Sequence, residues 1–393
     1  MTRRRWLILI WLLVVGLGAW FYLAYFAVPG AALERAEAFL FRRMTVAQLG
    51  EQGTYRFFFA TNRADSGDDV PVLERFGSER TDGLKYGYFD TRIEPNLGLG
   101  MLINPTQWFQ DEEIRVETVR PLEREDFVAK LSERVEASSR GSLLVVVHGF
   151  RERFPSALRK TAFIGHILDI NSPVLLFDWP GNQGSSPRGY LRARQVAEAS
   201  GAELAATLRM AIDEVNPERL WLFANSLGAQ VVADAFDILY SDERYADVET
   251  EFEDVVLTAP DVDHDEFDER FREEITALSE KLTVYVSSND RALVLSRIIN
   301  RSPRRGESTL SPDQLEEAVR IAELIEPGDD RMDLIDVTPV NRTRNFHSFS
   351  LETPEFFDDL YLRLANSEMP DSRLLYQIKT EDGEVYWVLT RGR

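Results

Sequence analysis

The chain has 393 residues, contains no cysteine and carries a formal net charge of −21 at pH 7. Its length allows two domains or one elaborated domain, and a hydrophobic content of 44% is sufficient for a large buried core. The absence of cysteine excludes disulfides, thiolate catalysis and cysteine-ligated metal, and because an acidic protein repels phosphate backbones we expect no nucleic-acid partner.

The first thirty residues predict a transmembrane helix. Trp6 to Val28 is an apolar run that, as a helix, is long enough to cross roughly 30 Å of hydrocarbon. Three arginines at 3–5 precede it, and by the positive-inside rule they stay in the cytoplasm, which places the rest of the chain on the far side. The alternative is a cleaved signal peptide, whose apolar core is usually about 7–15 residues long. Because this run is longer and Val28-Pro29-Gly30-Ala31 is a poor cleavage site, we predict an anchor over residues 1–30.

Residues 31–53 predict a short amphipathic helix, since apolar side chains recur at helical spacing among charged ones. We expect it to lie on the membrane surface or on the globular part, and we assign it no chemistry. Residues 54–393 are predicted to form one domain. Its first elements are predicted strands at 55–61, 84–93 and 114–119, a polar Asp/Gly-rich loop at 63–83 and a helix at 126–137.

From residue 142 onward, apolar runs alternate with helical patterns. Continuous apolar runs are typical of strands buried on both faces, and their alternation with helices predicts an α/β fold with a mostly parallel sheet flanked by helices. In such sheets functional residues collect at the carboxyl ends of the strands. The predicted strands are 142–149, 173–178, 219–225, 254–259, 281–286 and 332–337, with helices at 153–169, 191–216 and 354–365. We also predict an insertion at about 301–331 and a hairpin at about 373–391 that turns at Asp382-Gly383.

One junction between strand and helix indicates a reaction. The run from Arg219 to Asn225 stops at Ser226, and a helical pattern starts directly behind it. Ala224-Asn-Ser-Leu-Gly228 is the small-x-Ser-x-small pattern of a nucleophile elbow, in which the serine sits on a strained turn. The same pattern occurs in tight connections that carry no chemistry, so its meaning depends on whether a base and an acid accompany it.

A serine hydroxyl needs a base to remove its proton, and the chain has four histidines. His347 follows the last core strand, where an alpha/beta hydrolase delivers its base. His166 lies within a predicted helix, His264 lies in an acidic loop, and His148 ends the first core strand, where we expect it to shape a loop. Elimination leaves His347 as the candidate base.

The acid has two candidates. Asp290 follows the strand before the final one and gives the chain order Ser, Asp, His that is typical of alpha/beta hydrolases. Asp261 follows an earlier strand and remains the alternative. The alternating aspartates at 261–265 also suggest a calcium loop, but the glycine and the closing glutamate of an EF-hand are missing.

A developing oxyanion needs backbone N–H donors, one from the residue after the nucleophile and one from the loop after the His-Gly strand. These donors are Leu227 and Phe150. The loop at 180–187 lacks the ending of a phosphate-binding loop, so we interpret it as a pocket wall or lid. We expect no cofactor and no metal.

Together these segments resemble the bacterial family of alpha/beta hydrolases of unknown function. The resemblance covers roughly residues 54 to 365 and implies Ser226 as nucleophile, Asp290 as acid and His347 as base. It implies a reaction class but no substrate. Asn225 departs from the pattern, since many members carry histidine there. The segments are Phe59-Ala-Thr-Asn-Arg63, Val147-His-Gly-Phe150, Phe177-Asp-Trp-Pro180, Ala224-Asn-Ser-Leu-Gly228, Ala259-Pro-Asp261, Tyr285-Val-Ser-Ser-Asn-Asp-Arg-Ala-Leu293 and His347-Ser.

We therefore expect a serine hydrolase with an alpha/beta-hydrolase fold, anchored by one transmembrane helix, whose domain lies on the periplasmic side of a bacterial inner membrane. Its expected substrate is a small-molecule or lipid-like acyl ester. Two alternatives remain: an inactive hydrolase fold that serves as a binding or scaffolding module of the cell envelope, and an acyltransferase that uses the same triad. The sequence does not indicate an oligomeric state.

Overall fold

The computed structural model describes residues 54–93, 114–168, 170–246, 250–262, 272–287, 332–341, 349–366, 375–379 and 385–390. The predicted anchor, the predicted helix at 31–53 and the predicted insertion at 301–331 lie outside these residues. Within the described ranges, no helix is both long enough and apolar enough to cross a membrane.

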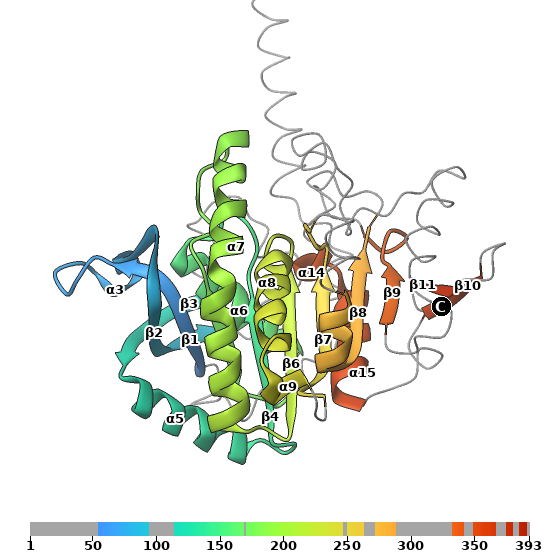
Figure 1. Cartoon of the computed structure of the whole chain (residues 1–393), viewed down its shortest axis with the longest axis horizontal. Coiled ribbons are helices and arrows are strands. Elements are labelled where there is room, and N and C mark those ends of the chain that lie inside the picture. Colours follow the sequence, from blue (N-terminus) through green and yellow to red (C-terminus); the bar gives the residue numbers. More distant parts are fainter. Residues whose placement is uncertain are drawn as a thin grey trace, which may run out of the picture.

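The described strands form one eleven-stranded sheet (Figure 1). The strands are β1 (Thr54–Asp65), β2 (Phe76–Ile93), β3 (Ile114–Leu122), β4 (Ser142–Val147), β5 (Val174–Asp178), β6 (Arg219–Asn225), β7 (Phe252–Thr258), β8 (Ser279–Val286), β9 (Met332–Asp336), β10 (Leu375–Lys379) and β11 (Val385–Leu389). Their order is β10-β11-β9-β8-β7-β6-β4-β5-β1-β2-β3. The strands from β11 to β1 in this order pair in parallel, whereas β2, β3 and β10 are antiparallel to their neighbours. The predicted mostly parallel sheet is confirmed.

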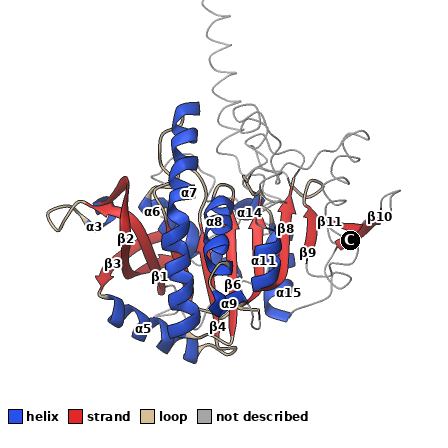
Figure 2. Ribbon diagram, in the orientation of Figure 1, coloured by secondary structure: helices blue, strands red, loops and turns tan. Residues whose placement is uncertain are grey.

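Helices cover both faces of this sheet (Figure 2). They are α3 (Val72–Arg75), α5 (Arg124–Ala137), α6 (Phe154–Leu168), α7 (Pro187–Met210), α8 (Gly228–Tyr240), α9 (Glu243–Ala246), α11 (Arg272–Leu278), α14 (Phe349–Glu352) and α15 (Pro354–Asn366). Side chains of β4 alternate between two cores because successive residues of a strand point to opposite faces. Val145 and Val147 pack with α5, α7 and α8, and Leu144 and Val146 pack with α6 and α15. This double burial explains why the core strands have uninterrupted apolar sequences.

The predictions for two segments are wrong at their boundaries. The segment 63–83, predicted as a loop, mostly continues the hairpin: β1 runs to Asp65, β2 begins at Phe76, and Arg63 pairs with Arg80 across a register shift. Its polar composition hid the strands because most of its side chains are exposed or half-buried. The helix predicted at 191–216 begins earlier, at Pro187, because Ser186 caps it by accepting a hydrogen bond from the Gly189 N–H at 3.1 Å.

The C-terminal strands extend the main sheet. β10 and β11 pair antiparallel in the region where the sequence predicts a hairpin, and β11 lies parallel to β9. The predicted turn at Asp382-Gly383 lies outside the described residues.

Helix α15 is fixed to the sheet by buried charges. Arg363 pairs with Asp254 on β7 and, at 2.7 Å, with Asp333 on β9, and the side chains of Arg363 and Asp254 are only 3% and 5% exposed. Asp254 also accepts a hydrogen bond from the Thr283 hydroxyl at 3.1 Å. Because buried charges are tolerated only when paired, this network defines where α15 docks.

Replacing Arg363 with methionine tests that network. The substitution keeps most of the side-chain volume but leaves two carboxylates without their cation, so we expect the free energy of unfolding to fall by about 3–5 kcal/mol. Urea unfolding followed by circular dichroism measures the change. The matched control is Arg244→Met, because Arg244 also pairs with two aspartates but its side chain is 64% exposed, and we expect no measurable effect there. Equal unfolding midpoints for Arg363→Met and the unmodified protein would show that the network does not stabilise the fold.

Candidate active site

Ser226 lies in a sharp turn between β6 and α8. Its φ is 53°, a left-handed conformation that is unfavourable for a residue with a side chain. Two hydrogen bonds hold the turn: the Ser226 N–H donates to Thr258 O at 2.9 Å, and the Asp261 N–H donates to Ser226 O at 3.1 Å. The predicted elbow is therefore formed as a strained turn fixed by the neighbouring strand β7.

The glycines around Ser226 are required by close approach. A Cβ atom on Gly228 would lie 2.6 Å from His148 O, and one on Gly149 would lie 2.9 Å from Ser226 Cβ. The loop that follows β4 therefore touches the elbow directly. Small residues are needed at both points because any side chain would push the two backbones apart.

Both predicted oxyanion donors border this contact. Leu227 directly follows Ser226 and Phe150 directly follows Gly149. Within the part of the chain that the structure describes, neither backbone N–H donates a hydrogen bond, although the neighbouring Ser226 and Arg151 N–H groups do. Unpaired N–H groups beside a serine are what a developing oxyanion requires.

The other two predicted catalytic residues, Asp290 and His347, lie outside the described residues. The residues that flank them are described. Ser350, three positions after His347, accepts a hydrogen bond from the Asn225 side chain at 3.0 Å. Ser287, three positions before Asp290, accepts one from the Asn341 side chain at 2.8 Å.

The alternative acid, Asp261, lies beside the elbow. It is buried, and its Oδ2 accepts a hydrogen bond from the Tyr190 hydroxyl at 2.9 Å. The Tyr190 ring in turn packs edge-to-face against Phe150, with centroids 5.5 Å apart. The start of α7 is thus attached both to the loop after β7 and to the loop that carries one predicted oxyanion donor.

A fully buried ion pair lies next to these loops. The Arg63 Nε donates to Asp178 Oδ2 at 2.7 Å, and both side chains are 0% exposed. Thr61 Oγ1 donates to the same oxygen at 2.7 Å, and His148 Nε2 lies 3.0 Å from Asp178 Oδ1. Burial alone would raise the pKa of Asp178, but the Arg63 charge and the contact with His148 outweigh it and hold that pKa below its usual value.

All five N–H donors of Arg63 have an acceptor. Besides Asp178, these acceptors are the backbone oxygens of Gly77, Glu152 and Trp179 and the side-chain oxygen of Asn182, at 2.6–2.9 Å. Arg63 therefore joins β2 to the loops after β4 and β5. The loop at 180–187, interpreted from sequence as a pocket wall or lid, is held by this side chain at Asn182.

The roles of Arg63 and Asp178 were missed by sequence reasoning, although both residues lie in segments that carry the family resemblance. The signal was present: Asp178 directly ends the apolar run 174–177, and Arg63 follows the apolar run 57–60 after Thr61 and Asn62. Charged side chains are almost never fully buried unless they are paired, so two opposite charges at the carboxyl ends of core strands predict a buried ion pair. His148 shapes a loop, as predicted.

A small cavity of about 30 Å³ is lined by His148, Glu152, Lys160, Asn225 and Ser350 among others, and has room for water. Among the described residues, no group of three or more potential ligands is placed to hold a metal ion.

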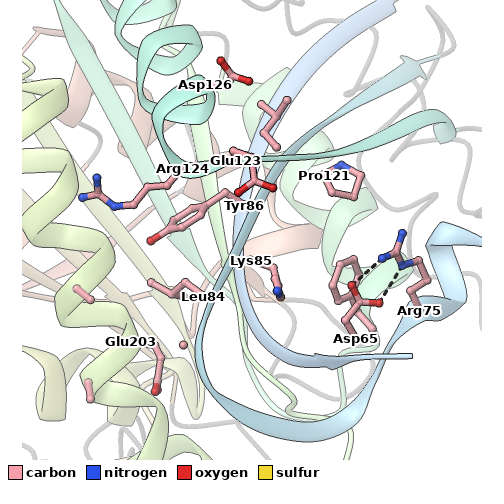
Figure 3. Close-up of a pocket in the computed structure, with 15 residues that line it drawn as sticks. Asp65, Arg75, Leu84, Lys85, Tyr86, Pro121, Glu123, Arg124, Asp126 and Glu203 are labelled. Carbon is pink, nitrogen blue, oxygen red and sulfur yellow. Dashed lines mark hydrogen bonds and ion pairs between the residues drawn. The ribbon is translucent and has the colours of Figure 1, made fainter. Parts of the chain in front are cut away.

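A wide groove of about 860 Å³ lies elsewhere, between the β1–β2 hairpin, the start of α5 and α7 (Figure 3). None of the predicted catalytic residues lines it. Several of its charges are already paired, Arg75 with Asp65, Arg124 with Glu214, and Glu203 with Arg80. We assign it no part in the reaction.

Replacing Asp178 with asparagine tests the buried ion pair through pH. Because the pKa of Asp178 is lower in the folded protein than in the unfolded chain, its contribution to stability is complete above the unfolded value of about 3.9 and is lost as pH falls through the folded pKa. We expect Asp178→Asn to lower the free energy of unfolding at pH 7 and to flatten its decline below about pH 4. Urea unfolding between pH 3 and 7 measures both effects. Asp69→Asn, at an exposed position, is the control, and an unchanged acid limb in Asp178→Asn would contradict the assignment.

Comparison with solved structures finds chains of low sequence identity. An uncharacterized protein from Bacillus cereus is 15% identical with a TM-score of 0.37, covering 59% of this chain and 61% of its own, so the match spans less than two thirds of that protein. A cold-adapted esterase from an Arctic intertidal metagenomic library is 11% identical with a TM-score of 0.39, covering 80% and 97%. An esterase from Pyrococcus furiosus is 12% identical with a TM-score of 0.35, covering 56% and 80%. No protein of curated function matches the sequence.

A family model does match. It covers residues 123–360, more than half of the chain, and is described as "Alpha/beta hydrolase of unknown function (DUF900)". The matched region includes the elbow, the loops after β4 and β5, and the positions of all three predicted catalytic residues. With its mostly parallel sheet, helices on both faces and a serine at the strand-to-helix turn, the chain belongs to this family of alpha/beta hydrolases.

Proposed function

We propose that this protein is a serine hydrolase that cleaves a carboxylic ester or a related acyl substrate through Ser226, His347 and Asp290. The observation that carries the proposal is the strained elbow at Ser226, beside which two backbone N–H groups have no partner among the described residues. Neither feature stabilises the fold by itself. Both suit an acyl-transfer reaction, which needs a nucleophile held at a sharp turn and prearranged donors for the charge that develops.

The reaction then follows the Ser-His-Asp scheme. The Ser226 hydroxyl attacks the substrate carbonyl while His347 takes its proton, and the N–H groups of Leu227 and Phe150 stabilise the resulting oxyanion. His347 returns the proton to the leaving alcohol as the carbon–oxygen bond breaks, which gives an acyl-enzyme. Water, deprotonated by His347, attacks the acyl carbon and releases the acid and free Ser226. Asp290 holds the His347 ring in the required orientation.

The described ends of two loops support this triad. Ser350, the second described residue after His347, is bonded to Asn225, the neighbour of Ser226, so the chain that follows the proposed base contacts the elbow. Ser287 directly follows β8 and is bonded to Asn341, so the last described residue before Asp290 contacts the last described residue before His347. Asp261 is already bonded to Tyr190, which favours Asp290 as the acid.

An apolar surface beside the oxyanion loop favours an acyl substrate. Phe150 is half-buried and packs against Tyr190, and the next residue of α7, Leu191, is 43% exposed. Figure 1 shows that this end of α7 extends past the carboxyl ends of the strands. An acyl chain bound at Ser226 would remove these apolar side chains from water.

Mutation of the three residues tests the proposal. We expect Ser226→Ala to abolish labelling by a fluorophosphonate probe and to lower the kcat for chromogenic acyl esters by about 10⁴-fold or more, with His347→Ala similar and Asp290→Asn smaller. Esters of increasing acyl length, each compared with Ser226→Ala, measure the substrate preference.

Asp261→Asn is the matched control for Asp290→Asn. If Asp261→Asn loses more activity than Asp290→Asn, the acid is Asp261. Labelling that persists in Ser226→Ala would overturn the nucleophile, and the lack of ester cleavage by labelled, folded protein would favour acyl transfer or a binding role instead.

We also propose that residues Trp6–Val28 anchor the protein and that the hydrolase domain lies on the periplasmic side. The support is the length of the apolar run and the three arginines before it. In bacterial cells, we expect the full chain to stay in the membrane pellet after carbonate extraction and a variant without residues 1–30 to be soluble. Protease added to spheroplasts should digest the domain. Protection of the domain from protease would reverse the orientation.

A further inference from the structure

We infer that Arg63, Asp178 and His148 are positioning residues that orient the Phe150 N–H toward the oxyanion. The buried ion pair between Arg63 on β1 and Asp178 would then affect how well the transition state at Ser226 is stabilised. This inference rests on the proposed function. It assigns a role to three residues outside the proposed triad. Asp178 and His148 lie within the region matched by the family model, and Arg63 lies before it.

The first step is the geometry of one peptide group. The Gly149 carbonyl and the Phe150 N–H belong to the same planar trans peptide, so they point in opposite directions. The Nδ1 of His148 lies 2.9 Å from Gly149 O, and because a carbonyl oxygen only accepts, this contact is a hydrogen bond in the tautomer that carries its proton on Nδ1. By holding that carbonyl, His148 fixes the direction in which the Phe150 N–H points.

The second step is the immobility of the His148 ring. Its Nε2 lies 3.0 Å from Asp178 Oδ1, and its plane stacks on the Trp179 ring at an angle of 8° with centroids 5.5 Å apart. Trp179 Nε1 also donates to His148 O at 2.7 Å. The Trp179 backbone N–H also donates to Nε2 at 3.2 Å. The ring is therefore fixed on its Nε2 edge by the groups of Asp178 and Trp179 and on its face by an indole.

The third step is the anchoring of Asp178 and of the far end of the loop by one cation. Arg63 holds Asp178 through Nε and holds the Glu152 carbonyl through Nη2 at 2.9 Å. The loops after β4 and β5 are also joined directly, because the Arg151 N–H donates to Gly181 O at 2.9 Å. Arg151 has a positive φ of 70°. In this loop the Gly149 and Glu152 carbonyls and the Arg151 N–H are all bonded, whereas the Phe150 N–H has no partner among the described residues.

The opposing view is that this cluster only stabilises the core. A core role would lower stability without a specific effect on the chemical step, whereas loss of one oxyanion donor lowers kcat by about 10²–10³-fold. The experiment therefore measures kcat and KM separately on folded protein, together with the rate of fluorophosphonate labelling of Ser226.

Two substitutions of His148 form a matched pair. The side-chain amide of His148→Asn places an N–H where Nδ1 donates to Gly149 O, and that of His148→Gln reaches the position of Nε2 near Asp178. We expect His148→Gln to lower kcat and the labelling rate by about 10²–10³-fold with KM nearly unchanged, and His148→Asn to recover at least about tenfold of that loss. Equal losses in both variants would overturn the inference.

Asp178→Asn and Asp254→Asn form the second pair. Each breaks a buried arginine–aspartate pair, but only Asp178 is connected to the oxyanion loop. We expect both to unfold at lower urea concentration and only Asp178→Asn to lose kcat, by about 10²–10³-fold. If Asp178→Asn does not fold, the His148 pair decides the question. If wild-type protein is labelled at Ser226 and cleaves esters, and His148→Gln is equally active, the positioning role is refuted and the proposed function stands. If wild-type protein is not labelled, the proposed function itself is refuted.

Discussion

The ion pair between Arg63 and Asp178 is the constraint on which the rest of the site depends. Neither side chain has any exposed surface, and a buried charge is costly unless it is paired and all its hydrogen bonds are made. Arg63 meets this condition only because five oxygens from separate segments surround it. Those segments include the loops after β4 and β5. Because every N–H group of the Arg63 guanidinium needs an acceptor, the position of Arg63 determines where the loops beside Ser226 lie.

The elbow and the oxyanion loop meet at a contact with no room for a side chain. Ser226 is held in a left-handed conformation by hydrogen bonds to the strand and loop of β7, and Gly149 touches it from the other side. A strained backbone persists only where its surroundings fix it. In the proposed reaction that rigidity has a chemical use, because donors that are already oriented need no rearrangement when negative charge develops in the transition state.

The first three strands are part of the hydrolase fold and contribute to its candidate site. The family model begins at residue 123, after β3, yet β1 pairs with β5 in the main sheet and supplies Thr61 and Arg63 to Asp178. The sequence predicted strands there but a loop at 63–83. The reason is that a hairpin extending beyond the core has mostly polar side chains, as loops do. Burial of Arg63 at the base of that hairpin depends on contacts more than a hundred residues away in sequence, such as that with Asp178.

The sequence by itself determined the class of the fold, the elbow at Ser226 and the order of the core strands along the chain, because apolar periodicity and small residues at a tight turn are local properties. It also predicted Phe150 and Leu227 as oxyanion donors, because each follows a core strand at a fixed number of residues. Only the tertiary structure decided that Arg63, Asp178 and His148 form one cluster and that Asn225 is bonded to Ser350. The physical reason is that pairing between buried polar groups depends on which strands are neighbours in the sheet, and strand order in the sheet is not a property of any local segment.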